Sequence, residues 1–150
     1  MKAKIEDLLN RDYSQIDEEI KYHLQNYLCV LISGYLETEI NNQLKEYKKT
    51  QHFKTHECME KLSGEKLQNA TWCKIKPILG IIEDSFPSNL KNTINDFELT
   101  IQAIQSIIDN RNNIAHGKNI NVLTIQVLNQ NFIKIDNFIT ELKKIFVAYQ

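Results

Sequence analysis

The segment DNRNNIAHGK at residues 109–118 interrupts a regular helical pattern. Upstream of it, large apolar side chains recur every three or four positions, at Phe97, Ile101, Ile104 and Ile108. This spacing predicts an amphipathic helix with one face directed at a core. The next position on that face is Arg111. A charged residue therefore stands where another aliphatic side chain is expected.

The same segment also contains the expected end of the helix. His116 follows Arg111 after five positions, and Gly117 can adopt the left-handed conformation in which helices end. Burying the guanidinium and the amides of Asn112 and Asn113 without partners would cost on the order of several kcal/mol. We therefore expect Arg111, Asn112 and Asn113 to face a pocket or a second subunit.

The composition favours a single all-α domain. The chain has 150 residues, of which 42% are hydrophobic and 25% charged, close to the averages of globular proteins. Four glycines and two prolines are too few for a turn-rich β-sandwich or barrel. We expect one domain over residues 1–150, with a core at about 14–149, built as a bundle of four to five helices.

Apolar periodicity places the first helices. Residues 1–16 predict a short helix or arm, and the longest apolar stripe predicts a helix from about Ser14 to Tyr47. Within that helix the small pair Ser33 and Gly34 is expected to pack closely against a second helix.

The second half of the chain predicts three further helices and one break. Pro77 suits the first turn of a short helix that ends near Asp84, and a break follows at residues 86–88. The helix that carries Arg111 should run from about Thr93 to Ala115, with Asn92 or Thr93 as its cap. Asn121 or Thr124 should start a last long helix that continues to the end of the chain.

The polar connection between Lys48 and Ser63 is either a loop or a modest helix. His52 and His56 lie four residues apart with Cys58 nearby, so they could share a helix face as metal ligands. Solvent-exposed histidines in a polar connection are the simpler interpretation. The chain has three cysteines without metal-ligand spacing, which predicts reduced and mostly buried thiols. We expect neither a metal nor a cofactor.

The charge balance limits how the chain can attract polyanions. The formal net charge is −1, so any phosphate recognition must come from a local cluster, and only Arg11 and Arg111 are arginines. The first residues lack the apolar run of a secretory signal, and no stretch of 18 apolar residues occurs. We expect no membrane association and a cytoplasmic location.

Arginine and histidine together suit the cleavage of a phosphate ester. Arginine can hold a phosphate through two parallel hydrogen bonds, and histidine exchanges protons near neutral pH. In RNA the 2′-hydroxyl can attack the adjacent phosphate, so a catalyst needs a proton acceptor, a proton donor and a positive group. A metal is not required when these three are present.

The motif RNNIAHG at residues 111–117 resembles the signature of HEPN domains (higher eukaryotes and prokaryotes nucleotide-binding), in which His follows Arg after four to six residues. Its ending is similar to that of the RiboL-PSP-HEPN and MAE-type branch, which LISGYLE at residues 31–37 also resembles. The resemblance implies a homodimeric, metal-independent endoribonuclease that acts as a toxin or in antiviral defence. It also implies an RNA substrate, and an antitoxin or a defence-system protein as a partner.

The resemblance assigns roles by position. Arg111 would stabilise the transition state, His116 would act as acid or base, and Asn112 would orient the phosphate or the motif backbone. Two copies of His116 across a dimer would share the donor and acceptor roles and leave a 2′,3′-cyclic phosphate.

Three further residues are weaker candidates for substrate binding. Asn113 belongs to the polar run, and Glu37 either lines the cleft, pairs with Arg111 or is simply exposed. Lys118 stands where nucleotidylated HEPN toxins have a tyrosine, so silencing of that kind is not expected; it either adds positive charge near the phosphate or is solvated. The alternative function is a non-catalytic HEPN-like module for nucleotide or RNA binding or for dimerisation. A third hypothesis is a helical interaction protein without a phosphate site.

Overall fold

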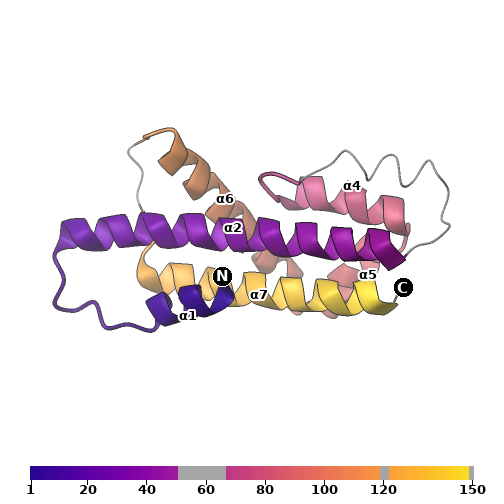
Figure 1. Cartoon of the computed structure of the whole chain (residues 1–150), viewed down its shortest axis with the longest axis horizontal. Coiled ribbons are helices and arrows are strands. Elements are labelled where there is room, and N and C mark those ends of the chain that lie inside the picture. Colours follow the sequence, from indigo (N-terminus) through magenta and orange to yellow (C-terminus); the bar gives the residue numbers. More distant parts are fainter. Residues whose placement is uncertain (51–66, 119–121, 149–150) are drawn as a thin grey trace.

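The computed structural model of the chain describes residues 1–50, 67–118 and 122–148, and these residues form six helices and no strand (Figure 1). The helices are α1 (Lys2–Leu9), α2 (Glu18–Thr50), α4 (Trp72–Ile82), α5 (Phe86–Thr93), α6 (Phe97–Ala115) and α7 (Ile125–Ala148). The predicted all-α fold is confirmed, but the predicted number of four to five helices was too low, because α5 replaces an expected break. His52, His56 and Cys58 lie outside the described residues.

The long helices α2 and α7 lie side by side and run in the same direction (Figure 1). Contacts between the two helices occur in the same order along both. The ring of Tyr35 lies 5.9 Å from that of Phe132, and farther along, the ring of Tyr47 lies 5.6 Å from that of Phe146. Helix α6 packs against both helices and buries Ile104 among them. The three helices therefore share one apolar core.

Aromatic side chains connect the shorter helices to this core. Trp72, at the start of α4, meets Phe97 of α6 and Phe138 of α7 edge to face, at ring distances of 5.0 and 6.3 Å. Phe86, at the start of α5, lies 5.0 Å from Phe146 of α7. Such edge-to-face pairs are favourable arrangements of aromatic rings. They hold α4 and α5 against one end of the bundle.

The start of α2 and the surroundings of Gly34 differ from expectation. The helix begins at Glu18, because Asp17 caps it: its side chain accepts a hydrogen bond from the backbone N–H of Glu19 at 2.8 Å. The prediction of close helix packing at Gly34 was wrong. The nearest atom to a Cβ placed there is the sulfur of Met1 at 4.0 Å, which leaves open space on this face of α2.

Both prolines lie at unexpected positions. Helix α4 begins at Trp72, so Pro77 is an interior residue rather than one of the first turn. Pro77 and Cys73 are both exposed, and water can therefore hydrate the carbonyl that has lost its N–H partner. The expected break at residues 86–88 is instead the start of α5, whose first turn contains Pro87.

Helix α6 begins at Phe97, four residues later than predicted. The Thr93 hydroxyl donates to the carbonyl of Asn89, so Thr93 completes α5 and does not cap α6. The residue before α6 is Asp96, which has a left-handed backbone with φ of 56°. The predicted end of α6 at Ala115 is confirmed, and Thr124 caps α7 by accepting the N–H of Val127 at 3.3 Å.

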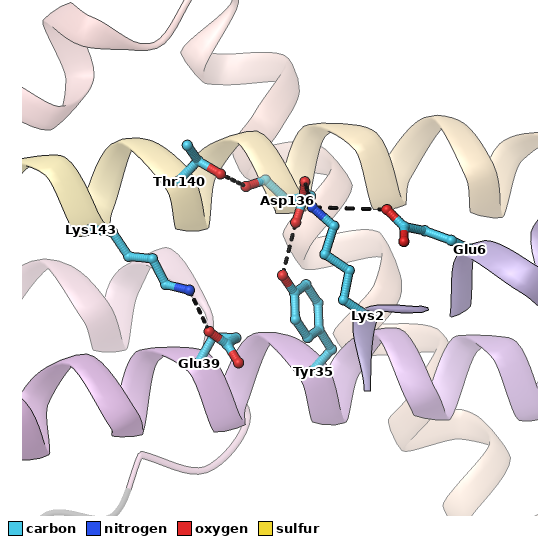
Figure 2. Close-up of polar contacts among 7 residues, drawn as sticks. All are labelled: Lys2, Glu6, Tyr35, Glu39, Asp136, Thr140 and Lys143. Carbon is cyan, nitrogen blue, oxygen red and sulfur yellow. Dashed lines mark hydrogen bonds and ion pairs between the residues drawn. The ribbon is translucent and has the colours of Figure 1, made fainter. Parts of the chain in front are cut away.

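A polar network joins α1, α2 and α7 on the side shown in Figure 2. The carboxylate of Asp136 on α7 accepts hydrogen bonds from the Tyr35 hydroxyl at 2.8 Å and from the Lys2 ammonium at 2.7 Å. Farther along, Lys143 and Glu39 form an ion pair at 2.7 Å. Asp136 thus fixes the register of α2 against α7 and holds α1 on the pair.

The Tyr35 hydroxyl should stabilise the fold in a pH-dependent way. Burial, and then the bond to Asp136, raise the pKa of Tyr35 above its usual value of about 10. Its contribution is therefore complete below about pH 10, where the unfolded tyrosine is also neutral, and is lost as the pH rises further. Tyr35→Phe should lower the free energy of unfolding by about 1–2 kcal/mol at pH 7, and by less at pH 11.

Urea unfolding of the wild type and the variant at both pH values measures this difference. Tyr22→Phe is the matched control, because Tyr22 lies on the exposed side of the same helix. An equal loss at both pH values for Tyr35→Phe would contradict the assignment.

Candidate active site

Arg111 lies in the last turn but one of α6 and is half-buried. Its Nη1 donates hydrogen bonds to the side-chain oxygens of Asn112, at 3.1 Å, and Asn69, at 3.4 Å. Both partners are neutral amides. Among residues 1–50, 67–118 and 122–148 no carboxylate forms an ion pair with Arg111, and the side chain is hydrogen-bonded there to Asn69 and Asn112.

The guanidinium lines a pocket of about 590 Å³. One wall is a single face of α2. Its residues at positions 34, 37, 38, 41 and 42 recur at helical spacing of three or four positions, so their side chains lie on the same side of the helix. The other walls come from the segment before α4, from Arg111 and from the chain start. The lining residues are Met1, Gly34, Glu37, Thr38, Asn41, Asn42, Leu67, Gln68, Asn69 and Arg111.

The segment before α4 is fastened to α2 by two side chains. Asn41 donates to the carbonyl of Leu67 at 3.1 Å and accepts its N–H at 3.0 Å. Glu37 accepts the N–H of Asn69 at 2.7 Å. Asn69 has φ of 51°, a left-handed conformation that asparagine tolerates better than most residues. These bonds place the Asn69 side chain within reach of Arg111.

Cys29 of α2 supports the turn of α6 that carries Arg111. Its buried thiol donates a hydrogen bond to the carbonyl of Ile107, one turn before Arg111, at 3.4 Å. Burial raises the pKa of this thiol to about 12, so it stays neutral at physiological pH and serves packing. The prediction of a buried thiol is confirmed for Cys29 and wrong for Cys73, which is exposed.

His116 ends α6 and lies outside the pocket wall. Its backbone N–H donates to the carbonyl of Asn112 at 3.1 Å, and its side chain is exposed. Gly117 follows with φ of 61°, the left-handed conformation that ends the helix. Five residues along a helix correspond to a rotation of about 140°. One chain therefore presents Arg111 and His116 on different sides of the end of α6.

The structure groups the predicted site residues unevenly. Glu37 and Arg111 line the same pocket, and Asn112 contacts Arg111. Asn113 is half-buried without lining the pocket, and Lys118 is exposed one residue after Gly117. The C-terminal end of α6 projects beyond α2, in the upper left of Figure 1. His116 and Lys118 are therefore accessible to another molecule.

Sequence reasoning missed the amide side chains that complete the pocket. Thr38, Asn41 and Asn42 share the face of α2 that carries Glu37, a polar stripe that the sequence does display. Asn69 has no comparable signal, because it reaches Arg111 from a segment 42 residues away in the chain.

Neither a cluster of metal ligands nor a membrane-spanning helix occurs among the described residues. No group of three or more His, Cys, Asp or Glu side chains gathers there as a metal site. None of the helices described is both long and apolar enough to cross a bilayer.

The sequence model of the RiboL-PSP-HEPN family matches residues 2–148, almost the whole chain. The chain therefore belongs to the RiboL-PSP-HEPN family, within the all-α HEPN domains. No curated protein and no solved structure matches it. Membership suggests a ribonuclease-like or nucleotide-binding function.

Proposed function

We propose that the protein is a metal-independent endoribonuclease that cleaves RNA by attack of a 2′-hydroxyl on the adjacent phosphate. The observation that carries this proposal is the half-buried guanidinium of Arg111, which lines a pocket and has no ion-pair partner within the described residues. A guanidinium in such a position favours an anion, and its two parallel N–H groups can hold a phosphate through two hydrogen bonds.

The motif residues then take separate roles. Arg111 binds the scissile phosphate and stabilises the charge that builds on it. Asn112 accepts a hydrogen bond from Nη1 of Arg111 and orients the guanidinium. His116 transfers a proton, either from the 2′-hydroxyl or to the leaving 5′-oxygen. The products are a 2′,3′-cyclic phosphate and a 5′-hydroxyl.

A homodimer supplies the second proton-transfer group. Arg111 and His116 of one chain lie on different sides of the end of α6, so the cleft is complete only when a second copy contributes its motif. Large apolar side chains are exposed on α2 just before the pocket, with Ile20 at 61% and both Tyr27 and Val30 at 42%. Ile20 and Tyr27 precede Gly34 by 14 and seven residues, which places all three on one side of α2. This side is suited to contact with a second copy.

The biological role follows from the family resemblance alone. We propose a toxin or an antiviral defence effector in the cytoplasm, with an antitoxin or a defence-system protein as its partner. Lys118 is exposed beside His116 and adds positive charge at the mouth of the composite cleft.

A second function is favoured by one observation. His116 does not line the pocket that contains Arg111. A module that binds a nucleotide or RNA, or that only dimerises, needs Arg111 and the pocket but no imidazole beside them.

Incubation of the purified chain with RNA in EDTA tests the proposal. We expect cleavage at the same rate with and without EDTA, and fragments that end in 2′,3′-cyclic phosphate. RNA binding without cleavage would support the binding module, and cleavage that EDTA abolishes would refute the metal-independent mechanism. Light scattering on the same sample should show a dimer, whereas a strict monomer at high concentration would contradict the composite cleft.

A further inference from the structure

We propose that the pocket beside Arg111 binds a guanine base, so that the nuclease cuts RNA next to guanosine. This inference rests on the proposed function only for the cleavage step, because base binding by the pocket is a separate property. The proposed substrate class is RNA that contains an unpaired guanosine.

The size and polarity of the pocket suit one nucleotide. Its volume of about 590 Å³ lies within the range of roughly 300–1,000 Å³ that is usual for small-molecule sites. Amide or hydroxyl side chains belong to five of its ten lining residues, and Met1, which is 58% exposed, supplies apolar surface for the face of a base. Single-stranded RNA is recognised in this way, with unstacked bases read along their hydrogen-bonding edges.

Glu37 decides between the bases. It is the one carboxylate among the described residues of the pocket wall. Its Oε1 accepts the N–H of Asn69, whereas its Oε2 has no partner in residues 1–50, 67–118 and 122–148. A carboxylate accepts hydrogen bonds and cannot donate them when ionised. The base that binds here must therefore present N–H groups.

Guanine alone presents two adjacent donors on its Watson–Crick edge, N1–H and the 2-amino group. These two donors match the two oxygens of a carboxylate, and Oε1 retains a lone pair beside its bond to Asn69. Adenine and cytosine place a ring acceptor beside their amino group, and uracil places carbonyls on both sides of its N–H. Each of the other three bases would bring a lone pair against Glu37.

The remaining side chains agree with this orientation. Asn41 is committed to the backbone of Leu67, so it maintains the wall rather than reading the base. Asn42 is exposed at the same face of α2 and can donate its amide to O6 of guanine. Arg111 lies in the same pocket, which places a phosphate next to the bound base.

Titration of the four ribonucleoside 3′-monophosphates into the wild-type protein, followed by NMR or calorimetry, tests the pocket. We expect GMP to bind at least about tenfold more tightly than the other three, the discrimination typical of a bidentate contact to a base. Inosine monophosphate lacks only the 2-amino group and should bind about tenfold more weakly than GMP. Equal binding of the nucleotides, or no binding of GMP, would overturn the proposal.

Glu37→Gln provides the matching variant. Its side-chain oxygen can still accept the N–H of Asn69, so the pocket wall and the melting temperature should be retained, but the preference for GMP should fall to under about threefold. Glu46→Gln, at an exposed position on the same helix, should change nothing. A wild-type preference for GMP in the Glu37→Gln variant would assign the selectivity to another residue and refute the proposal.

Mapping of cleavage sites on a mixed-sequence RNA separates free nucleotide from RNA as the source of guanine. We expect wild-type cuts next to guanosine and dispersed cuts by Glu37→Gln. Cleavage without base preference would overturn the guanine pocket and leave the nuclease intact. Selective GMP binding without any cleavage would support the pocket and refute the nuclease.

Discussion

His116→Ala should lower the rate of RNA cleavage by about 10²–10⁴-fold and leave the fold unchanged. The magnitude is that of general acid–base catalysis by one positioned side chain. The His116 side chain is exposed, and its backbone N–H, which makes the bond to Asn112, is present in alanine as well. Single-turnover cleavage in EDTA measures the rate, and thermal unfolding followed by circular dichroism checks the fold.

A control for this variant is Lys144→Ala. Lys144 is also exposed and lies near the end of α7, where it pairs with Glu141 of the same helix, outside both the pocket and the proposed dimer contact. It should cleave RNA like the wild type. Wild-type cleavage by His116→Ala would remove His116 from the mechanism and, with RNA binding retained, would favour the non-catalytic module.

Arg111→Ala should lower cleavage by about 10²–10³-fold, the usual cost of removing one group that stabilises developing charge. It should also weaken RNA binding, since the phosphate loses its cation. Arg111→Lys keeps the positive charge but lacks the planar fork, so it should restore only part of the rate. Single-turnover cleavage and filter binding separate the two effects.

Lys118→Ala is the control for charge alone. Lys118 is exposed and its backbone N–H bonds to the carbonyl of Asn113, so the substitution removes one cation near the motif without disturbing the helix end. We expect a change of less than about threefold at moderate salt, because exposed charges are screened. A larger loss for Lys118→Ala than for Arg111→Ala would contradict the role of Arg111 as the main phosphate ligand.

Periodicity predicted the part of the fold that depends on apolar burial. The stripe through Phe97, Ile104 and Ile108 is buried in the structure, and Arg111, the next residue of that stripe, lines a pocket. Boundaries that depend on backbone conformation were harder to predict. Asp96, the residue before α6, has a left-handed conformation that is unusual outside glycine, and no sequence pattern predicts it.

The helix α5 was missed for a related reason. Phe86 followed by Pro87 is consistent with a break and also with the first turn of a helix. The helix is favoured because it buries Phe86 and Leu90 in the core, and such tertiary contacts cannot be derived from local residue types.

Site residues could be predicted only where they lie on a helix that shows a recognisable sequence pattern. The sequence left open whether Glu37 lines a cleft, pairs with Arg111 or is exposed, and in the structure Glu37 lines the pocket. Arg111 was identified by its place in an apolar stripe. Asn69 approaches from a segment far away in the sequence, so its contact with Arg111 depends on the folded structure. The catalytic roles of Arg111, His116 and Asn112 stay predictions.

The attachment of Leu67 and Asn69 to α2 has a consequence for evolutionary change. Both anchoring side chains, Asn41 and Glu37, belong to α2, and they bind backbone groups of Leu67 and Asn69. A backbone N–H or carbonyl is present whichever side chain stands at the position. Relatives that keep Asn41 and Glu37 can therefore exchange the side chain at position 67 and retain the bonds that attach this segment to α2.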